Sequence, residues 1–366
     1  MRIGIDGREL VGGMRTGIGR YLIEVLRAAS HADLECRVYG DGRTRLPVTL
    51  PGVSLHRLHA GPTLWVDQVG LPRRLARDRI AVFLSPYYKG PLCAPCPVVI
   101  TVHDLMFIRY PGSRRPLYDL VMTRLVRLYA AQAAAVIADS QYSKRFIVET
   151  LGVNDAKVTV IPVALGAEFK SEPLTDAVTL RYGIVPPYIL YVGNFLPHKN
   201  VSRLVQAYAG LDKALKDTYQ LVLAGGDREP RHDLERLAGR LSVADRVFFT
   251  GLIEDADLPA VYSGCTLFVL PSLEEGFGLP ALEAMACGAP VAASNRAAIP
   301  EVVGDAALLF DPENVVAMAK AMAEALSQPD MRERMRWRGL ARAAAFTPDR
   351  TVGRVVALLR EVGLRR

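Results

Sequence analysis

The chain has 366 residues, half of them hydrophobic and 23% charged, and this composition predicts two domains that can each bury a core. The first residues, MRIGID, indicate a strand rather than a signal peptide, and no apolar stretch has membrane-spanning length, so we expect a soluble protein of the cytoplasm. The net charge is +7 and uneven, with 22 Lys and Arg against 13 Asp and Glu in residues 1–165 and 23 against 25 in the remainder. The basic part favours an anionic partner, such as the inner face of a membrane, a phosphate-bearing acceptor or nucleic acid; a solvated basic face explains it equally well.

Short apolar segments alternate with helix-like segments in the first half of the chain. One helical pattern places Ile18, Leu22, Val25, Leu26 and Ala29 on a single face. The predicted strands here are Arg2–Asp6, Leu34–Tyr39, Ala81–Ser85, Val98–Val102, Ala134–Ala138 and Val158–Ile161.

The five cysteines are scattered, which is typical of reduced thiols inside a cell. Cys93 and Cys96 form a CxxC between two predicted strands, without a second pair that would complete a zinc site. We interpret this pair as structural, and a redox role is the alternative.

The same alternation continues in the second half. Near-continuous apolar strands separated by helices predict parallel sheets that are covered on both faces, so we expect two doubly wound, Rossmann-like α/β domains. The predicted strands are Tyr188–Val192, Leu221–Ala224, Val247–Thr250, Leu267–Leu270, Pro290–Ala293 and Ala307–Phe310.

The boundary between the domains is predicted within ALGAEFKSEPLTD, residues 164–176, which is rich in Gly, Pro and polar residues. We therefore expect an N-terminal domain over 1–166 and a C-terminal domain over 167–346. A helix over 347–366, separated by Thr347-Pro348-Asp349, is expected to pack back on the N-terminal domain.

Three loops at predicted carboxyl ends of strands could hold a ligand. The first, GRELVGGMRTGIGRY, contains Gly13 and Gly17 ahead of a helix, where a ligand phosphate could approach the backbone. Leu22 occupies the third glycine position of a dinucleotide fingerprint, which excludes that motif; a tight turn is the alternative. The second loop, Gly193–Asn200, carries Lys199 just ahead of a helix, either as a diphosphate clamp or as an exposed surface lysine.

The third loop follows the strand Leu267–Leu270 and carries two acids, Glu275 in a Gly-rich bend and Glu283 in a short helix predicted over Ala281–Cys287. Backbone N–H groups of Phe277–Leu279 are expected to face the same site. Helix capping explains an acid near a helix start but not both acids in this arrangement. A hydrolase acid and base pair is an alternative, which the phosphate-suited loops disfavour.

These motifs together resemble retaining glycosyltransferases of family 4, which have the GT-B fold of two Rossmann-like domains facing a central cleft. EGFGLPALE, with Glu275 and Glu283 eight residues apart, is similar to the family's paired-glutamate motif. The resemblance extends over nearly the whole chain. It includes GAPVAASNRAAIPEVVGDAALLFDP, GNFLPHKN, TGIGRY, VHDL and ADSQYSK.

The resemblance implies a role for each matching position. Glu283 would hold the ribose hydroxyls, Glu275 the donor sugar and Lys199 the diphosphate, with Leu252 near the base and His103 over the sugar. The implied catalytic residues are His103, Lys199 and Glu275. The implied donor-binding residues are Gly17, Gly193, Asn194, Lys199, Leu252, Glu275, Gly276, Phe277, Gly278, Leu279 and Glu283. The implied acceptor-side residues are Gly13, Ser140 and Lys144.

Several positions have a second interpretation or depart from the family. Asn194 stands where many relatives carry Arg, so Arg109 or Arg203 is expected to supply the missing charge. His103 could be a buried structural histidine, although its place at a strand end favours a functional role. Ser140 also fits a helix N-cap.

The function predicted on this basis is transfer of a sugar, with mannose preferred, from a GDP- or UDP-sugar to a glycan or lipid-linked acceptor in cell-surface polysaccharide or glycolipid synthesis. Family members of this type need no metal or other cofactor, because cationic side chains and helix dipoles stabilise the diphosphate. We expect attack on the same face of the sugar, with retention of configuration, and closure of the domains to exclude water. Two alternatives stay open: an epimerase of the same fold that acts on the nucleotide sugar, and a non-catalytic nucleotide or nucleic-acid binding protein. No basic stripe interleaved with aromatics supports nucleic acid.

Overall fold

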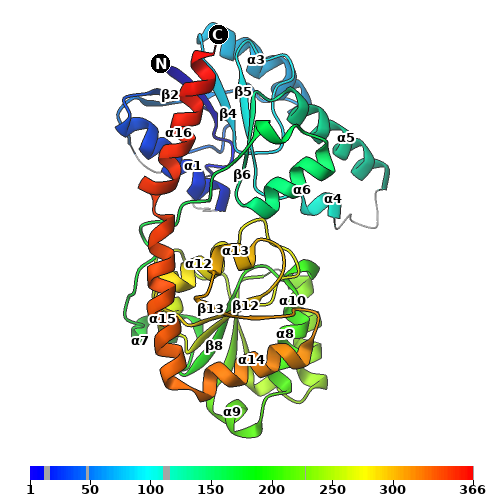
Figure 1. The fold of residues 1–366 in the computed structure, drawn as a ribbon, viewed down its shortest axis with the longest axis vertical. Helices are drawn as coiled ribbons and strands as arrows, with labels where there is room; N and C mark the ends of the chain where they lie inside the picture. The colour runs from blue at the N-terminus through cyan, green and yellow to red at the C-terminus, as the bar shows by residue number, and fades with distance from the viewer. Residues whose placement is uncertain (12–16, 47–48, 110–115, 227, 366) are drawn as a thin grey trace. The chain divides into compact units, whose positions relative to one another are not determined.

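The computed structural model describes residues 1–11, 17–46, 49–109, 116–226 and 228–365. The chain divides into two compact units, which are drawn in Figure 1. The N-terminal unit comprises Met1–Gly166 and Phe346–Arg366, and the C-terminal unit comprises Ala167–Ala345. None of the described helices is both long and apolar enough to cross a bilayer.

The N-terminal unit is built on a parallel sheet of seven described strands in the order β3-β2-β1-β4-β5-β6-β7. The strands are β1 (Arg2–Asp6), β2 (Glu35–Gly40), β3 (Val53–Arg57), β4 (Val82–Ser85), β5 (Val98–Val102), β6 (Ala135–Ala138) and β7 (Val158–Val160). The helices are α1 (Gly17–His31), α2 (Thr63–Trp65), the π-helical turn η1 (Val66–Gly70), α3 (Leu71–Arg77), α4 (Met106–Arg109), α5 (Pro116–Gln132), α6 (Gln141–Leu151), the 3₁₀ turn η2 (Asp155–Lys157) and α16 (Pro348–Leu364).

Successive side chains of these strands point to opposite faces of the sheet and pack in hydrophobic cores on both faces, because a strand is pleated. On one face, Ile3 and Val82 pack with α1 and with Val355 and Leu359 of α16. On the other, Phe83 packs with α3, while α5 and α6 cover the strands β5 and β6. The C-terminal helix α16, red in Figure 1, therefore completes the core of the N-terminal unit and packs against α1.

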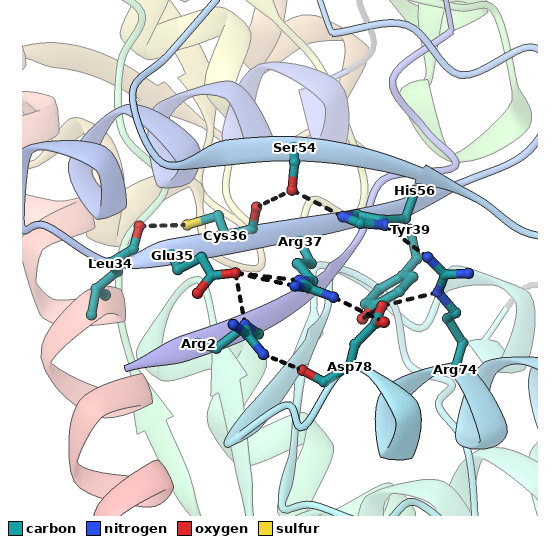
Figure 2. A network of polar contacts seen from close by, with 10 residues as sticks. All are labelled: Arg2, Leu34, Glu35, Cys36, Arg37, Tyr39, Ser54, His56, Arg74 and Asp78. Atoms are coloured by element: carbon teal, nitrogen blue, oxygen red, sulfur yellow. Dashed lines mark hydrogen bonds and ion pairs between the residues drawn. The ribbon is translucent and has the colours of Figure 1, made fainter.

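A polar network ties β2 and β3 to α3 (Figure 2). Asp78, directly after α3, accepts hydrogen bonds from Tyr39 Oη and Arg74 Nε, each at 2.9 Å, and forms an ion pair with Arg37 at 2.9 Å. Arg74 also lies 3.0 Å from His56 Nδ1. Burial would raise the pKa of Asp78, but these donors lower it below the ordinary value, so the buried acid stays charged.

The C-terminal unit has a parallel sheet of six described strands in the order β10-β9-β8-β11-β12-β13. The strands are β8 (Tyr188–Val192), β9 (Gln220–Ala224), β10 (Val247–Gly251), β11 (Leu267–Leu270), β12 (Val291–Ser294) and β13 (Ala307–Phe310). The helices are α7 (Asp176–Tyr182), α8 (Val201–Ala209), α9 (Lys213–Thr218), α10 (Arg228–Arg240), α11 (Leu258–Gly264), α12 (Leu279–Ala286), α13 (Ile299–Val303), α14 (Val315–Ser327) and α15 (Pro329–Ala343). The 3₁₀ turns are η3 (Pro197–Lys199) and η4 (Ala244–Arg246), and η5 (Ala344–Phe346) runs from the last two residues of this unit to the first residue of the N-terminal unit's second segment.

Both units are doubly wound, so each has a switch point where the strand order reverses. In the N-terminal unit it lies between β1 and β4, and in the C-terminal unit between β8 and β11. The loops that follow these strands diverge to opposite faces of their sheet, which opens a site at the carboxyl edge between them.

The predicted fold class, two Rossmann-like parallel-sheet units, is confirmed. One strand, β3, is missing from the sequence prediction. It is an edge strand in which no residue is fully buried, so its segment, VSLHR, lacks the apolar run that marks the other strands. The helix predicted over Ala281–Cys287 begins two residues earlier and ends one residue earlier, as α12. The predicted interruption near Thr347 is the start of α16.

Candidate functional site

The switch point of the C-terminal unit carries a compact charged cluster. Lys199 ends the turn η3 after β8, and Glu275 lies in the loop after β11. Lys199 Nζ donates to Glu275 Oε1 at 2.7 Å, and Ser272 Oγ donates to the same oxygen at 2.7 Å. All three side chains are largely buried, so the carboxylate is held in one position. The two residues therefore join the two loops that flank the switch point.

The loop after β8 is fixed from behind by Asn200. This residue adopts φ +60°, which a non-glycine residue seldom does, and its buried Nδ2 donates to the carbonyls of Pro271 and Pro312 at 3.0 and 2.7 Å. Arg203 Nη1 donates to Asn200 Oδ1 at 2.9 Å, so this guanidinium supports the loop. Lys199 is thus presented from a rigid turn.

The helix α12 begins directly after this cluster. Its N-cap, Gly278, has φ +103° and supplies no side-chain cap. Pro280 stands in the first turn, where its missing N–H costs nothing. The N-cap residue therefore offers no side chain to the helix N-terminus, and the partial positive charge of such a terminus attracts anions. Phe277 is buried, Leu279 is the first helical residue and Gly276 precedes both in the bend.

Glu283 lies in the second turn of α12 and is buried. Tyr262 Oη donates to Glu283 Oε2 at 2.9 Å, which fixes the carboxylate. Burial, with a smaller contribution from Glu283, raises the pKa of the Cys287 thiol to about 12. The neighbouring thiol therefore stays protonated and adds no second negative charge beside Glu283.

Three glycines bring the loops after β8, β9 and β10 into close backbone contact. Gly193 N donates to Ala224 O at 3.0 Å, and Gly225 N donates to Gly251 O at 2.7 Å. A Cβ on Gly225, which has φ +97°, would lie 2.6 Å from the carbonyl oxygen of Gly193. The close approach of these loops therefore requires a glycine at position 225.

Asn194 and Leu252, which follow β8 and β10, present open surface. Asn194 is exposed, and its carbonyl accepts a 2.6 Å hydrogen bond from Tyr191 Oη. Leu252 is 84% exposed. Of the cations considered to replace the family's Arg, Arg203 holds Asn200, and Arg109 is described only by its backbone in α4. Among the described contacts, Lys199 is the cation bonded to the site acid.

The predicted residues of the N-terminal unit lie at the carboxyl ends of β5 and β6. His103 Nδ1 lies 2.8 Å from Asp139 Oδ2, and its ring packs edge-on against Tyr21 at 5.0 Å between centroids. Burial would lower the pKa of His103, but the charge and hydrogen bond of Asp139 outweigh this and raise it. No partner of His103 Nε2 is found among the described residues. One ring nitrogen is thus fixed, and the other is buried without a hydrogen-bond partner among the described residues.

Ser140 and Lys144, predicted on the acceptor side, belong to α6. Ser140 is fully buried and caps the helix by accepting from Ser143 N at 2.9 Å, so its hydroxyl has the capping role that the sequence also allowed. Lys144 forms an ion pair with Asp155 at 2.9 Å. Gly17 is the exposed first residue of α1. Gly13 lies outside the described residues.

Within the described residues, no group of three or more His, Cys, Asp or Glu side chains could hold a metal ion. The five cysteines are free thiols, with Cys93 exposed and Cys96 buried.

Comparison with known proteins decides the family. The family described as "Glycosyl transferases group 1" matches residues 184–342, and "Glycosyltransferase Family 4" matches residues 15–165. A D-inositol 3-phosphate glycosyltransferase from Salinispora tropica is 39% identical over 92% of this chain and 79% of its own. This chain belongs to the group 1, family 4 glycosyltransferases.

Other relatives are similar over part of their length. O-antigen chain mannosyltransferase B from Escherichia coli is 32% identical over 68% of this chain and 66% of its own. The chain spans about a third of the length of longer mannosyltransferases from the same organism. The sucrose-phosphate synthase of Thermosynechococcus elongatus superposes with a TM-score of 0.82 over 99% of both chains at 22% identity, which shows the shared GT-B fold.

Several well-placed residues of this glycosyltransferase were missed at the sequence level. Asp139 directly follows a predicted strand and Ser272 lies two residues after another, and these positions could have indicated them. Tyr262 could not have been found, because its pairing with Glu283 depends on how α11 packs on α12. Gly225 could have been identified, because two consecutive glycines after a predicted strand indicate a turn.

Proposed function

We propose that this glycosyltransferase moves a hexosyl residue, with mannose preferred, from a nucleoside diphosphate sugar to a hydroxyl group of a glycan or lipid-linked acceptor, with retention of configuration. The observation that carries the proposal is the cluster of Lys199, Glu275 and Ser272 at the switch point of the C-terminal unit. The mannosyl assignment draws support from the name of the related O-antigen chain mannosyltransferase.

Three features of the C-terminal unit suit three different parts of the donor. The N-terminus of α12 and the ammonium group of Lys199 suit the diphosphate, because both carry positive charge at a partly dry site. Glu275, held by Ser272, suits the hydroxyl groups of the sugar, and Glu283 suits those of the ribose. The loops after β8, β9 and β10 are in close backbone contact with one another. We assign the base of the nucleotide to the outer surface of these loops.

Lys199 would serve as an electrostatic catalyst. In the free protein its ammonium group is bonded to Glu275; a bound diphosphate would attract it as negative charge grows on the leaving oxygen. The bond between the anomeric carbon and the phosphate oxygen breaks, and a bond to the acceptor oxygen forms on the same face. The acceptor proton passes to the departing phosphate. Lys199 and the helix N-terminus supply the positive charge that this step needs, so we propose catalysis without a metal or other cofactor.

His103 is assigned to the donor sugar. Its Nε2 has no partner among the described residues, whereas Asp139 holds Nδ1. An imidazole fixed in this way can donate to a sugar hydroxyl. Asp139 acts through His103 and is a positioning residue.

We also propose peripheral contact with an anionic membrane through α5. Leu120, Val121 and Leu128 are 48%, 44% and 41% exposed and lie on one stripe of the helix with Arg124 and Arg127. Apolar side chains interspersed with arginines suit the headgroup region of an anionic bilayer. This surface would bring the enzyme to a lipid-linked acceptor.

The decisive experiment measures transfer from a panel of GDP- and UDP-sugars by the Lys199→Ala and Glu275→Ala proteins. Removing one preorganised charge from a site of this kind costs about 100-fold or more in kcat, and we expect a loss of that size in each variant. Lys213→Ala, which changes an exposed lysine on α9, is the matched control and should retain full activity.

Near-normal transfer by both variants would contradict the assignment. An NMR assay of the donor without acceptor tests the epimerase alternative, because turnover under those conditions would mean isomerisation rather than transfer. The anomeric configuration of the product, read from NMR spectra of the reaction with acceptor present, tests retention. Transfer that is abolished by EDTA and restored by a divalent ion would overturn the metal-free step.

A further inference from the structure

One buried tyrosine of the N-terminal unit lies between the helix α1 and the histidine that is assigned to the donor sugar. Tyr21 belongs to α1, close to its first residue, Gly17, and is 3% exposed. It packs in the core that α1 and α16 form on one face of the sheet. A tyrosine in such a core buries a hydroxyl group, which costs stability unless the group has a partner.

The hydroxyl group of Tyr21 has its partner on the sheet. Tyr21 Oη lies 3.1 Å from Thr101 Oγ1, and both residues are buried. Thr101 belongs to β5 and stands two residues before His103, which follows the end of that strand. The hydrogen bond therefore holds the Tyr21 side chain close to the carboxyl end of β5.

The ring of Tyr21 packs against the imidazole of His103. The two ring centroids are 5.0 Å apart and the ring planes meet at 81°, which is an edge-to-face arrangement. The same imidazole is bonded through Nδ1 to Asp139 Oδ2 at 2.8 Å. His103 is therefore held at two places, by a hydrogen bond and by an aromatic contact.

These two contacts restrict different motions of the imidazole. A single hydrogen bond fixes the position of Nδ1 but leaves the ring able to rotate about the line that joins Nδ1 to the carboxylate. A ring packed edge-to-face against the imidazole opposes that rotation. Since His103 Nε2 has no hydrogen-bond partner among the described residues, Asp139 and Tyr21 together set the direction in which it points.

Tyr21 contributes shape rather than charge to this arrangement. Burial raises the pKa of the Tyr21 hydroxyl, and the negative charge of Asp139 adds to this effect. The phenol therefore stays neutral beside the pair of His103 and Asp139, and it places no second negative charge there.

We propose that Tyr21 is a positioning residue for sugar transfer: it holds the His103 imidazole in the orientation from which Nε2 can donate to the donor sugar. The inference rests on the proposed function, which assigns His103 to that sugar. Because Tyr21 lies in α1, a displacement of the first turns of this helix would also reorient His103.

Two substitutions separate the hydroxyl group of Tyr21 from its ring. Tyr21→Phe keeps the ring and removes the bond to Thr101, whereas Tyr21→Leu removes the ring as well. The matched control is Tyr39→Phe, in the core on the opposite face of the same sheet. Tyr39 is also buried, and its hydroxyl group donates to Asp78 at 2.9 Å, as Figure 2 shows.

The first measurement is the heteronuclear NMR spectrum of the His103 ring in the full chain, assigned with His103→Ala. We expect the ring signals to shift and broaden in Tyr21→Leu, because the imidazole then takes more than one orientation. Tyr21→Phe should shift them less, and Tyr39→Phe should leave them in place. This measurement needs no substrate. Unchanged His103 signals in Tyr21→Leu would overturn the proposal.

The second measurement is transfer kinetics together with thermal unfolding. Tyr21→Phe should lower kcat by about fivefold, which corresponds to one hydrogen bond. Tyr21→Leu should lower it by about tenfold or more, because a small displacement of a group at the reacting centre is costly. In both variants the donor KM should stay within about twofold. Tyr39→Phe should lose thermal stability to a similar degree as Tyr21→Phe but keep its kcat.

A double-mutant cycle distinguishes positioning from a general loosening of the core. In the His103→Ala background, Tyr21→Phe should not lower kcat further, because the residue through which it acts is gone. An equal loss in both backgrounds would overturn the proposal, as would a normal kcat in both Tyr21 variants. A wild type that transfers no sugar from any donor would instead refute the proposed function, and the His103 spectrum would still decide whether Tyr21 holds the ring.

Discussion

His103 and His56 lie in the same unit, but their surroundings move their pKa values in opposite directions. Burial would lower the pKa of His103; Asp139, with help from Asp104, raises it. Burial lowers the pKa of His56, and the cations Arg37 and Arg74 lower it further, against the opposing effect of Asp78. The neighbouring charges therefore decide the direction of the His103 shift, whereas burial and the neighbouring cations act in the same direction at His56.

This contrast gives a pH prediction that NMR can check. We expect the His103 imidazole to titrate above 6.5 and the His56 imidazole below it. Asp139→Asn should move the His103 midpoint downwards, because burial then acts without the opposing carboxylate, while His56 should not move. A His103 midpoint unchanged in Asp139→Asn would contradict the assigned ion pair.

The sign of the linked stability follows from these directions. Since the folded pKa of His103 is raised, its ion pair contributes stability below about 6.5, the ordinary value, and this contribution is lost as pH rises through the folded pKa. His56 acts oppositely: it resists protonation in the fold, so acidification from about 6.5 towards its folded pKa destabilises the unit. The two contributions therefore have opposite signs in different pH windows: acidification restores the His103 contribution above about 6.5 and removes the His56 contribution below it.

At the level of elements, the strands with apolar runs and the helices between them were predictable, because both faces of each sheet are buried. The edge strand β3 was not, since its stability comes from pairing with β2 and from His56 in the polar network rather than from an apolar run. Lys199 and Glu275 could be expected near each other from their loops. The contact of Tyr21 with His103 could not, because it depends on how α1 packs on the sheet.

The exposed stripe of α5 gives a prediction about membranes. Each arginine near an anionic surface contributes about 1 kcal/mol, so Arg124→Gln with Arg127→Gln should weaken binding to phosphatidylglycerol vesicles roughly thirtyfold. Co-sedimentation at low salt measures this. A control with Lys213→Gln and Arg236→Gln, two exposed positions of the C-terminal unit, should bind like the wild type. Equal binding by all three proteins would remove α5 from the proposed function.

For the whole molecule, the division into units predicts that their stabilities can be changed separately. Leu359, fully buried in α16, packs in the core of the N-terminal unit, so Leu359→Ala should destabilise that unit by about 2–5 kcal/mol. Hydrogen exchange should then speed up in β1 and β4, more than 270 residues earlier in the sequence, and not in β8 or β11.

Leu326→Ala, in α14 of the C-terminal unit, is the reciprocal control and should loosen β8 without affecting β1. If either substitution loosened both sheets equally, the two units would have to unfold as one cooperative body.

The position of α16 also has a consequence for synthesis on the ribosome. The strands of the N-terminal unit emerge first, but the helix that covers one face of their sheet follows the 179 residues of Ala167–Ala345. At a synthesis rate of about 5–20 residues per second, that face of the sheet stays uncovered for roughly 10 to 40 s before α16 is made. The C-terminal unit, continuous in sequence, meets no such delay. Nascent chains of this enzyme should therefore expose Ile3, Val82 and their neighbours to chaperones until α16 has been made, after the unit made second has already folded.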